Sequence, residues 1–491
     1  MTSSKACYAS IALLLLSSCL SMSKQELTQN VLELPSVDKT VEDGLTSGYF
    51  TQGQWPEKEW WKVYKDEKLD HLIQTALTNN PSIQSIFRRV EEAKQDAKVV
   101  RSKLFPLVFF NYEETWQYLS KNGLYRALNP TVPLGANLID LSVSFNYEFD
   151  FWSKNLNGFR AALGREKSQE AEAAQVELIT TTAVAQAFFA LKTNIKKRNL
   201  QQQLVDATAA IYKLQTFMKN QALYSLLTPL TGHEDLQESQ KILIDIDDEI
   251  KFDKHLLNIL VGQGPDTELN IGDEISAIPE KLTLPQTLSI DLLARRPDLM
   301  AQIWKVEALS KDVAIAKADF YPSVNLMGFA GLESTMFAKL LHRSSKTGAL
   351  EPAIHLPIFT AGAIRANVRS KKAAFDQAVF DYNELILKST QEVADLIVLT
   401  QSIWEKKNIQ NKIVSEAKHL YDLVELRFEE GLDNLFNVLA SQISLLQKEL
   451  EEITLIYNQY LSSIKLIKSL GGGYISSYLP IKNDEVKNDG K

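Results

Sequence analysis

The sequence has little cysteine and histidine. Among its 491 residues there are two cysteines and six histidines, which leaves no disulfide framework and no metal-ligand spacing. No Gly-x-Ser-x-Gly or phosphate-loop pattern occurs, and acidic pairs such as Asp247-Asp248 are typical of solvated helix faces. We therefore expect no catalysis, no metal site and no cofactor.

Long apolar runs are missing beyond the N-terminus. Lys5, the apolar run Ile11 to Leu16 and two serines before Cys19 predict a secretory signal over residues 1–18. The tetrad that ends at Cys19 resembles a bacterial lipoprotein processing box, which predicts a covalent lipid on Cys19; ordinary cleavage nearby would leave a free thiol. No later run approaches the roughly 20 apolar residues of a spanning helix, so an integral membrane part would have to be a barrel.

Positive charge is not in excess. The chain carries 53 basic and 61 acidic residues, a net charge of −8, which argues against nucleic acid as a partner. Its composition, 45% hydrophobic and 23% charged, is that of an ordered chain, and its length exceeds one ordinary domain.

Proline is absent between Pro133 and Pro229 and again between Pro357 and Pro480, and such tracts can hold very long helices. A helix over residues 153–220 would span about 100 Å at 1.5 Å per residue. In the second tract Gly431 marks the turn of a helix hairpin. After it, apolar residues spaced 4-3-4-3 predict a coiled-coil seam. The seam residues are Leu439, Ile443, Leu446, Leu450, Ile453, Tyr457, Tyr460, Ile464 and Ile467.

Strict alternation marks residues 139–151 as a strand with one apolar and one polar face. A half-buried strand of a soluble sheet has this pattern, and so does a strand of a membrane barrel, with a lipid face and a lumen face. The apolar residues are Ile139, Leu141, Val143, Phe145, Tyr147, Phe149 and Phe151. The predicted lumen face holds Asp140, Ser142, Ser144, Asn146, Glu148 and Asp150, and from an earlier strand Asn111, Glu113, Thr115 and Gln117.

An internal repeat organises the chain. Placing Pro81 on Pro297 also aligns Val90 with Val306 and Pro106 with Pro322, and each copy runs from helix to strand pair to long helical tract. We expect an extended arm over 19–65, a first repeat over 66–294, a second over 295–479 and a tail over 480–491. The expected strands are about 105–118, 138–151, 320–333 and 349–359.

Several short motifs follow one another along the chain. In order they are Tyr147 to Trp152, Arg295-Arg296-Pro297-Asp298-Leu299, Ala318 to Ser323, Leu356 to Gly362, Arg427 to Gly431, and the terminal Ser469 to Tyr474. With them the chain resembles TolC-type outer-membrane efflux proteins, in particular the lipidated branch that includes OprM and NodT relatives. The resemblance implies a mixed α and β fold, in which a twelve-strand transmembrane barrel of a homotrimer continues into a coiled-coil helical tunnel across the periplasm.

The resemblance also implies partners. It predicts an exit duct in the outer membrane that docks a periplasmic adaptor and an inner-membrane transporter and passes small molecules outward. Four strands per chain cannot close a barrel, and three chains give twelve with room for a passage. A lipid-anchored periplasmic coiled-coil adaptor or scaffold without a pore is the alternative.

The resemblance places the periplasmic aperture at Asn437 and Ala440, with Phe436 nearby, where the family has acidic residues. We expect Phe436 to form an apolar gate; packing between neighbouring helices is its alternative role. The first hairpin, 217–236, lacks the usual glycine at Asn220 and is expected to carry extra residues around Pro229, Leu230, Thr231 and Gly232.

Overall fold

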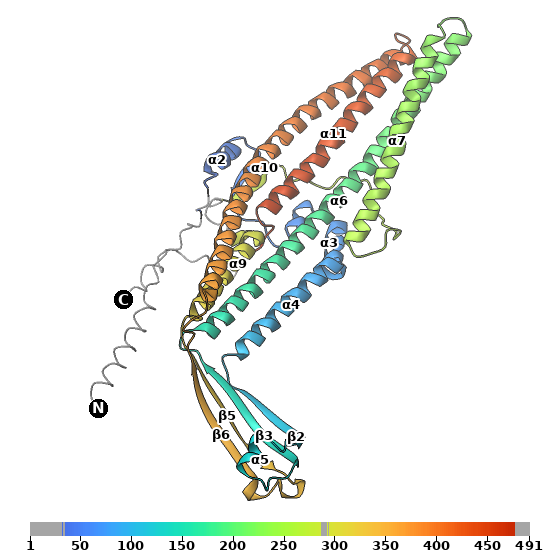
Figure 1. Cartoon of the computed structure of the whole chain (residues 1–491). Coiled ribbons are helices and arrows are strands. Elements are labelled where there is room, and N and C mark those ends of the chain that lie inside the picture. The colour runs from blue at the N-terminus through green and yellow to red at the C-terminus, as the bar shows by residue number, and fades with distance from the viewer. Residues whose placement is uncertain (1–31, 33–34, 286–291, 293, 477–491) are drawn as a thin grey trace. The chain divides into compact units, whose positions relative to one another are not determined.

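The computed structural model describes residue 32, residues 35–285, residue 292 and residues 294–476. The predicted signal, Cys19 and the tail 480–491 lie outside these described residues. Every element below belongs to the unit that spans residues 34–491. The fold mixes long helices with a four-stranded sheet (Figure 1), as expected.

The two halves of this unit repeat each other closely. Helices α4 (Pro81–Ser102) and α9 (Pro297–Ala318) both have 22 residues, and the strands that follow, β2 (Leu107–Tyr118) and β5 (Ser323–Ser334), both have 12. All four bounds differ by 216 residues, the offset that the aligned prolines predict. Each proline begins its helix at a position where the backbone N–H would have no helical partner.

Long hairpins follow each strand pair. Helix α6 (Lys154–Asn220) and helix α10 (Ala363–Glu429) both have 67 residues, about 100 Å at 1.5 Å per residue. Each turns back into a shorter helix, α7 (Leu227–Leu260) or α11 (Leu435–Ser469). Figure 1 shows both turns at the end of the helices away from the sheet. On α11 no predicted seam residue is exposed, and Leu446 and Ile453 pack with Leu200 and Leu204 of α6.

The sheet is antiparallel throughout, in the order β2-β3-β5-β6. Strand β3 is Gly135–Phe149 and β6 is Lys346–His355, so the last three strands begin about three residues away from the expected bounds. Residues Phe320 to Pro322 form the turn after α9, because proline cannot donate to a strand ladder. The short helical segments α5 (Leu124–Leu128), η2 (Phe337–Lys339) and η3 (Arg343–Ser345) lie in the two strand connections.

The segment before α3 (Glu67–Asn79) is not the extended arm that its glycines and prolines predict. It contains helix α2 (Asp38–Thr46), strand β1 (Phe50–Gly53) and the 3-10 helix η1 (Trp60–Tyr64). Strand β1 pairs in parallel with β4 (Leu282–Pro285). Apolar packing explains why this segment folds, since Phe50 is buried against Val393 and Ile397 of α10.

One helix departs from the prediction that no later segment suits a membrane span. Within the described part of the chain, α6 alone is long and apolar enough to cross a membrane, but 56% of its apolar window is buried. It packs against α3, α4, α7, α9 and α11, so its apolar residues form a protein core. Phe188, Phe189 and Leu191 are fully buried there.

A buried ion pair ties this core together. Lys192 of α6 donates to Asp66 at 2.7 Å, and the two side chains are only 8% and 10% exposed. Ser276 hydrogen-bonds to both of them. Burial alone would raise the pKa of Asp66, but hydrogen bonds from Lys192, Ser276 and the backbone N–H of Leu69 lower it. Asp66 is therefore charged, and it also caps α3.

Candidate functional site

The register gives the sheet two distinct faces. Residues directly opposite in an antiparallel pair point to the same side. Phe145 lies opposite Val108 and Gly328, and Val143 lies opposite Phe110 and Ala330. One face therefore collects most of the apolar side chains of the sheet, with members from all four strands. Its exposed members include Val108, Phe110, Tyr112, Trp116, Val143, Phe149, Leu350 and Ile354.

The apolar face has the height of a membrane. From the row of Ile139 to the row of Phe149 the strand advances 149 − 139 = 10 residues, about 34 Å along the strand. A tilt near 40° reduces this to about 26 Å, close to the apolar band of about 25 Å in outer-membrane barrels. Ile139 differs from its neighbours because it is fully buried within the chain.

Aromatic side chains mark both ends of this band. Tyr112, Trp116 and Tyr118 lie toward the strand connections. At the helix end Trp152 stacks on Tyr321, with ring centroids 4.6 Å apart, and its indole N–H donates to the carbonyl of Pro322 at 2.8 Å. Such rings suit a membrane–water boundary, because one part of each is apolar and the other polar.

The opposite face is predominantly polar. Nine of the ten residues predicted for the lumen lie on it, and they interact across it: the Asn111 amide donates to Ser144 Oγ at 2.9 Å, and the Ser142 hydroxyl donates to Asp140 at 2.6 Å. Ser142 is buried within the chain. The nine are Asn111, Glu113, Thr115, Gln117, Asp140, Ser142, Ser144, Asn146 and Glu148.

Asp150 is the tenth residue, and it lies outside the strand. Its carboxylate accepts the backbone N–H groups of Asn155 and Leu156 at 3.0 and 2.8 Å, so it caps the first turn of α6. Phe151 also lies in the turn after β3. The alternation of the sequence does not show where β3 ends, because the capping residue Asp150 falls at a position where a strand would also place a polar residue.

Sequence reasoning missed part of the polar face. Phe109, Met327, Phe329, Glu333 and Glu351 lie on it as well. The sequence contains a signal for those on β5, because Val324, Leu326 and Leu332 share one parity and the odd positions of β5 therefore face the other way.

The second hairpin tip contains all three predicted aperture residues on the first turns of α11. Phe436 is 36% exposed, and Asn437 and Ala440 are exposed. The Asn437 amide donates to Asp433 at 2.7 Å, and Arg427 lies 3.3 Å from the same carboxylate. These bonds and the Asn434 backbone N–H lower the pKa of Asp433. A carboxylate is thus present at this tip, one turn before the positions that the resemblance selects.

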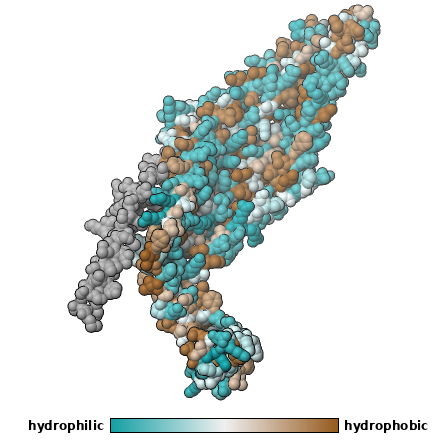
Figure 2. Space-filling model, in the orientation of Figure 1, coloured by the Kyte–Doolittle hydropathy of each residue, from teal (hydrophilic) through white to brown (hydrophobic). Residues whose placement is uncertain are grey.

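The first hairpin tip is helical at the residues that the sequence singled out. Pro229, Leu230, Thr231 and Gly232 lie in the first turns of α7. Ala222 takes the left-handed conformation, with φ of 58°, where Gly431 has φ of 73° in the second hairpin. Exposed apolar side chains gather at this tip (Figure 2). They are Leu223, Leu226, Leu227 and Leu230.

The family model of outer membrane efflux proteins matches this chain twice, over residues 72–217 and 288–472. The chain belongs to this family. Each matched segment holds a helix that precedes a strand pair, the strand pair itself and the long helix after it, and the second segment also holds α11. An outer membrane efflux protein is a channel and not an enzyme, in agreement with the sequence prediction and against a scaffold without a pore.

Relatives of this efflux protein match along most of their length. It is 27% identical over 431 residues to the multidrug resistance outer membrane protein MdtP of Escherichia coli K12, covering 86% of this chain and 87% of that one. It is 28% identical over 473 residues to the putative multidrug resistance outer membrane protein MdtQ of Shigella flexneri, covering 94% and 96%.

Solved structures agree with this fold. The outer membrane protein VceC of Vibrio cholerae has a TM-score of 0.76 and 28% identity, covering 85% of this chain and all of that one. The CmeC outer membrane channel of Campylobacter jejuni has a TM-score of 0.81 and 22% identity, covering 92% and 96%.

Proposed function

We propose that this efflux protein works as a homotrimer whose three sheets close one twelve-strand barrel. The observation that supports this is the two-faced sheet with two unpaired edges, β2 and β6. Unpaired strand edges and an exposed apolar face are costly in a lone chain, and a lipid environment requires closure. Because the four strands alternate in direction, β6 of one chain would meet β2 of the next in antiparallel pairing.

In this assembly the polar face lines the passage and the apolar face meets lipid. The two long hairpins of each chain extend the passage into the periplasm, where an adaptor and an inner-membrane transporter deliver the cargo. The exposed leucines of the first tip, Leu223, Leu226, Leu227 and Leu230, supply an apolar surface for such a contact. The relatives named for multidrug resistance support drug-like small molecules as the cargo.

The covalent lipid on Cys19 is the remaining element of the proposal, and it would anchor the chain in the outer membrane. Radioactive palmitate should label the wild-type protein and leave Cys19→Ser unlabelled. Equal labelling of both proteins would contradict lipid attachment at this residue.

The trimer is tested on outer-membrane fractions from cells that express the full chain. We expect a band of three chains in unheated samples that converts to one chain on boiling, and single-channel currents after reconstitution in planar bilayers. A monomer that stays in the soluble fraction when the membranes are pelleted would overturn the proposal.

A further inference from the structure

Two neighbouring rows interrupt the polar face of the sheet. Phe109, Ser144 and Phe329 share one row, and Asn146, Met327 and Glu351 share the next. We refer to these six residues as the aromatic patch. Phe109 is 51% exposed, Met327 is 38% exposed and Phe329 is 37% exposed. Large exposed apolar side chains on a face where carboxylate, amide and hydroxyl groups predominate indicate a binding role.

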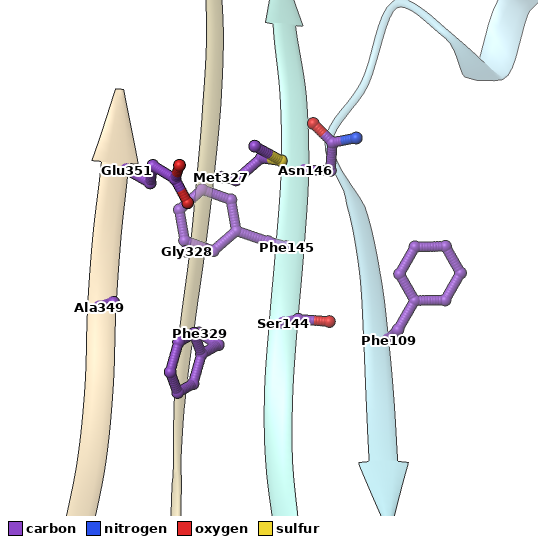
Figure 3. Close-up of a pocket in the computed structure, with 9 residues that line it drawn as sticks. All are labelled: Phe109, Ser144, Phe145, Asn146, Met327, Gly328, Phe329, Ala349 and Glu351. Atoms are coloured by element: carbon purple, nitrogen blue, oxygen red, sulfur yellow. The ribbon is translucent and has the colours of Figure 1, made fainter. Parts of the chain in front are cut away.

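The spacing of the two rings suits a flat molecule. Phe109 and Phe329 stand on either side of the small residue Ser144 (Figure 3). Adjacent strands lie about 4.8 Å apart, so the two phenylalanine backbones are about 10 Å apart. A third ring fits between them, since carbon atoms in contact need about 3.5–4.0 Å on each side.

The hollow is small. Its volume is about 230 Å³, below the roughly 300–1,000 Å³ of sites that hold a whole drug-sized ligand. It therefore suits one or two rings of a molecule, held briefly and released, as conduction requires.

The charge of this face selects the sign of the ligand. Glu351 belongs to the patch, and Glu113, Asp140, Glu148 and Glu333 lie on the same face. Within the four strands, all of which the structure describes, no lysine or arginine shares that face; Lys346 lies on the other one, opposite Leu332. Aromatic ring faces and a methionine sulfur add favourable contacts to a soft organic cation.

We propose that the aromatic patch is a transient binding site, one per chain, for amphiphilic organic cations that pass through the barrel. This inference rests on the proposed function, because only a closed barrel makes the polar face a lumen. A small inorganic cation would bind through the carboxylates alone. An aromatic cation also contacts the phenylalanine rings, so it binds more tightly.

Tetraphenylphosphonium is a suitable probe, since it joins phenyl rings to a single positive charge. Its binding to the trimer in lipid nanodiscs is measured by equilibrium dialysis of the radiolabelled cation, with empty nanodiscs as the blank. Phe329→Ser and Glu351→Gln should each raise the dissociation constant about tenfold. Glu333→Gln is the matched control, because it removes the same charge from the same face outside the patch, and it should change binding less than twofold.

Planar-bilayer recordings give a second readout. The cation should interrupt the wild-type current, and the interruptions should shorten in Phe329→Ser. Equal effects of Glu351→Gln and Glu333→Gln, with none from Phe329→Ser, would overturn the patch and leave only a negative lumen. A conducting trimer that the cation neither binds nor blocks overturns the inference alone. A wild-type protein that forms no trimer and no channel overturns the proposed function and the inference with it.

Discussion

At the residue scale, one position in β3 decides between lipid and lumen. Phe145→Arg should prevent assembly, because an arginine on the lipid face costs roughly 2–4 kcal/mol per chain near the midplane and three chains would bear it. The ring of Phe145 also covers Gly328 on that face. Ser144→Arg, the adjacent residue on the polar face, should assemble and change conductance. Equal trimer yields from outer-membrane fractions for the two variants would refute the assigned faces.

The buried pair of Lys192 and Asp66 gives a second residue-scale prediction. Lys192→Met should cost about 3–5 kcal/mol, because it leaves a buried carboxylate without its cation. Adding Asp66→Asn should recover most of this loss, since asparagine can still cap α3. Chemical unfolding of the purified protein measures both. Lys241→Met, which removes an exposed pair with Glu238, serves as the control and should cost little.

Asp253 gives a pH-dependent prediction. Burial raises its pKa to about 6, with Glu249 adding to the effect and a hydrogen bond from Asn194 opposing it. Between its ordinary pKa near 3.9 and about 6, the folded chain holds a proton that the unfolded chain has released. Stability should therefore fall as the pH rises through this window and stay lower above it.

Asp253→Asn should remove this dependence and raise the melting temperature at pH 7, with no gain at pH 4. Asp248→Asn is the control, since the side chain of Asp248 is half-exposed on the same helix and pairs with Lys251. The difference in melting temperature between the wild type and Asp253→Asn should change with pH. A difference that stays constant would contradict the raised pKa.

At the element scale, the two hairpin turns make opposite predictions. Ala222 and Gly431 both have positive φ, a conformation that glycine adopts freely and alanine does not. Ala222→Gly should stabilise the chain by roughly 0.5–1 kcal/mol, and Gly431→Ala should destabilise it by a similar amount. The left-handed conformation costs alanine roughly 1–2 kcal/mol, and the greater freedom of glycine in the unfolded chain offsets part of this. Nothing lies within 4 Å of a β-carbon at Gly431, so the second loss would come from backbone strain alone. Thermal unfolding of the two variants should shift in opposite directions.

Long regular elements were predictable from sequence, and junctions were not. The Pro-free tracts and the aligned prolines predict α6, α10 and the 216-residue offset, because each rests on many residues that agree. Within the described residues 35–65 the prediction of an extended arm was wrong, because it gave the glycines and prolines more weight than Phe50, Trp60 and Trp61. Those apolar side chains find their partners on α10, α6 and α11, which lie far away in sequence.

The candidate site shows the same division. Alternation along β3 predicts its two faces from that strand alone. The aromatic patch depends on all four strands in register, and the pattern along one strand does not show which residues of its neighbours share a row with it. Asn437 was selected by resemblance, and only the hairpin geometry reveals that its amide is already occupied by Asp433.

At the scale of the whole molecule, the gate depends on three chains meeting. If Phe436 closes the passage by excluding water, Phe436→Ser should raise the open probability in single-channel recordings. Millimolar divalent or trivalent cations added from the periplasmic side should block the wild type weakly, because Asp433 is already paired with Arg427. Tight block of the wild type, with no effect of Phe436→Ser, would assign the constriction to other side chains.

The equal lengths of α6 and α10 constrain how such a chain can change over evolution. Both helices begin beside the sheet and end at a tip, and both have 67 residues. Gaining seven residues in one helix alone would step its tip about 10 Å past the other. Insertions and deletions must therefore arise in pairs, one in each repeat. A length change in one long helix that the other does not match would leave the two hairpin tips at different distances from the sheet.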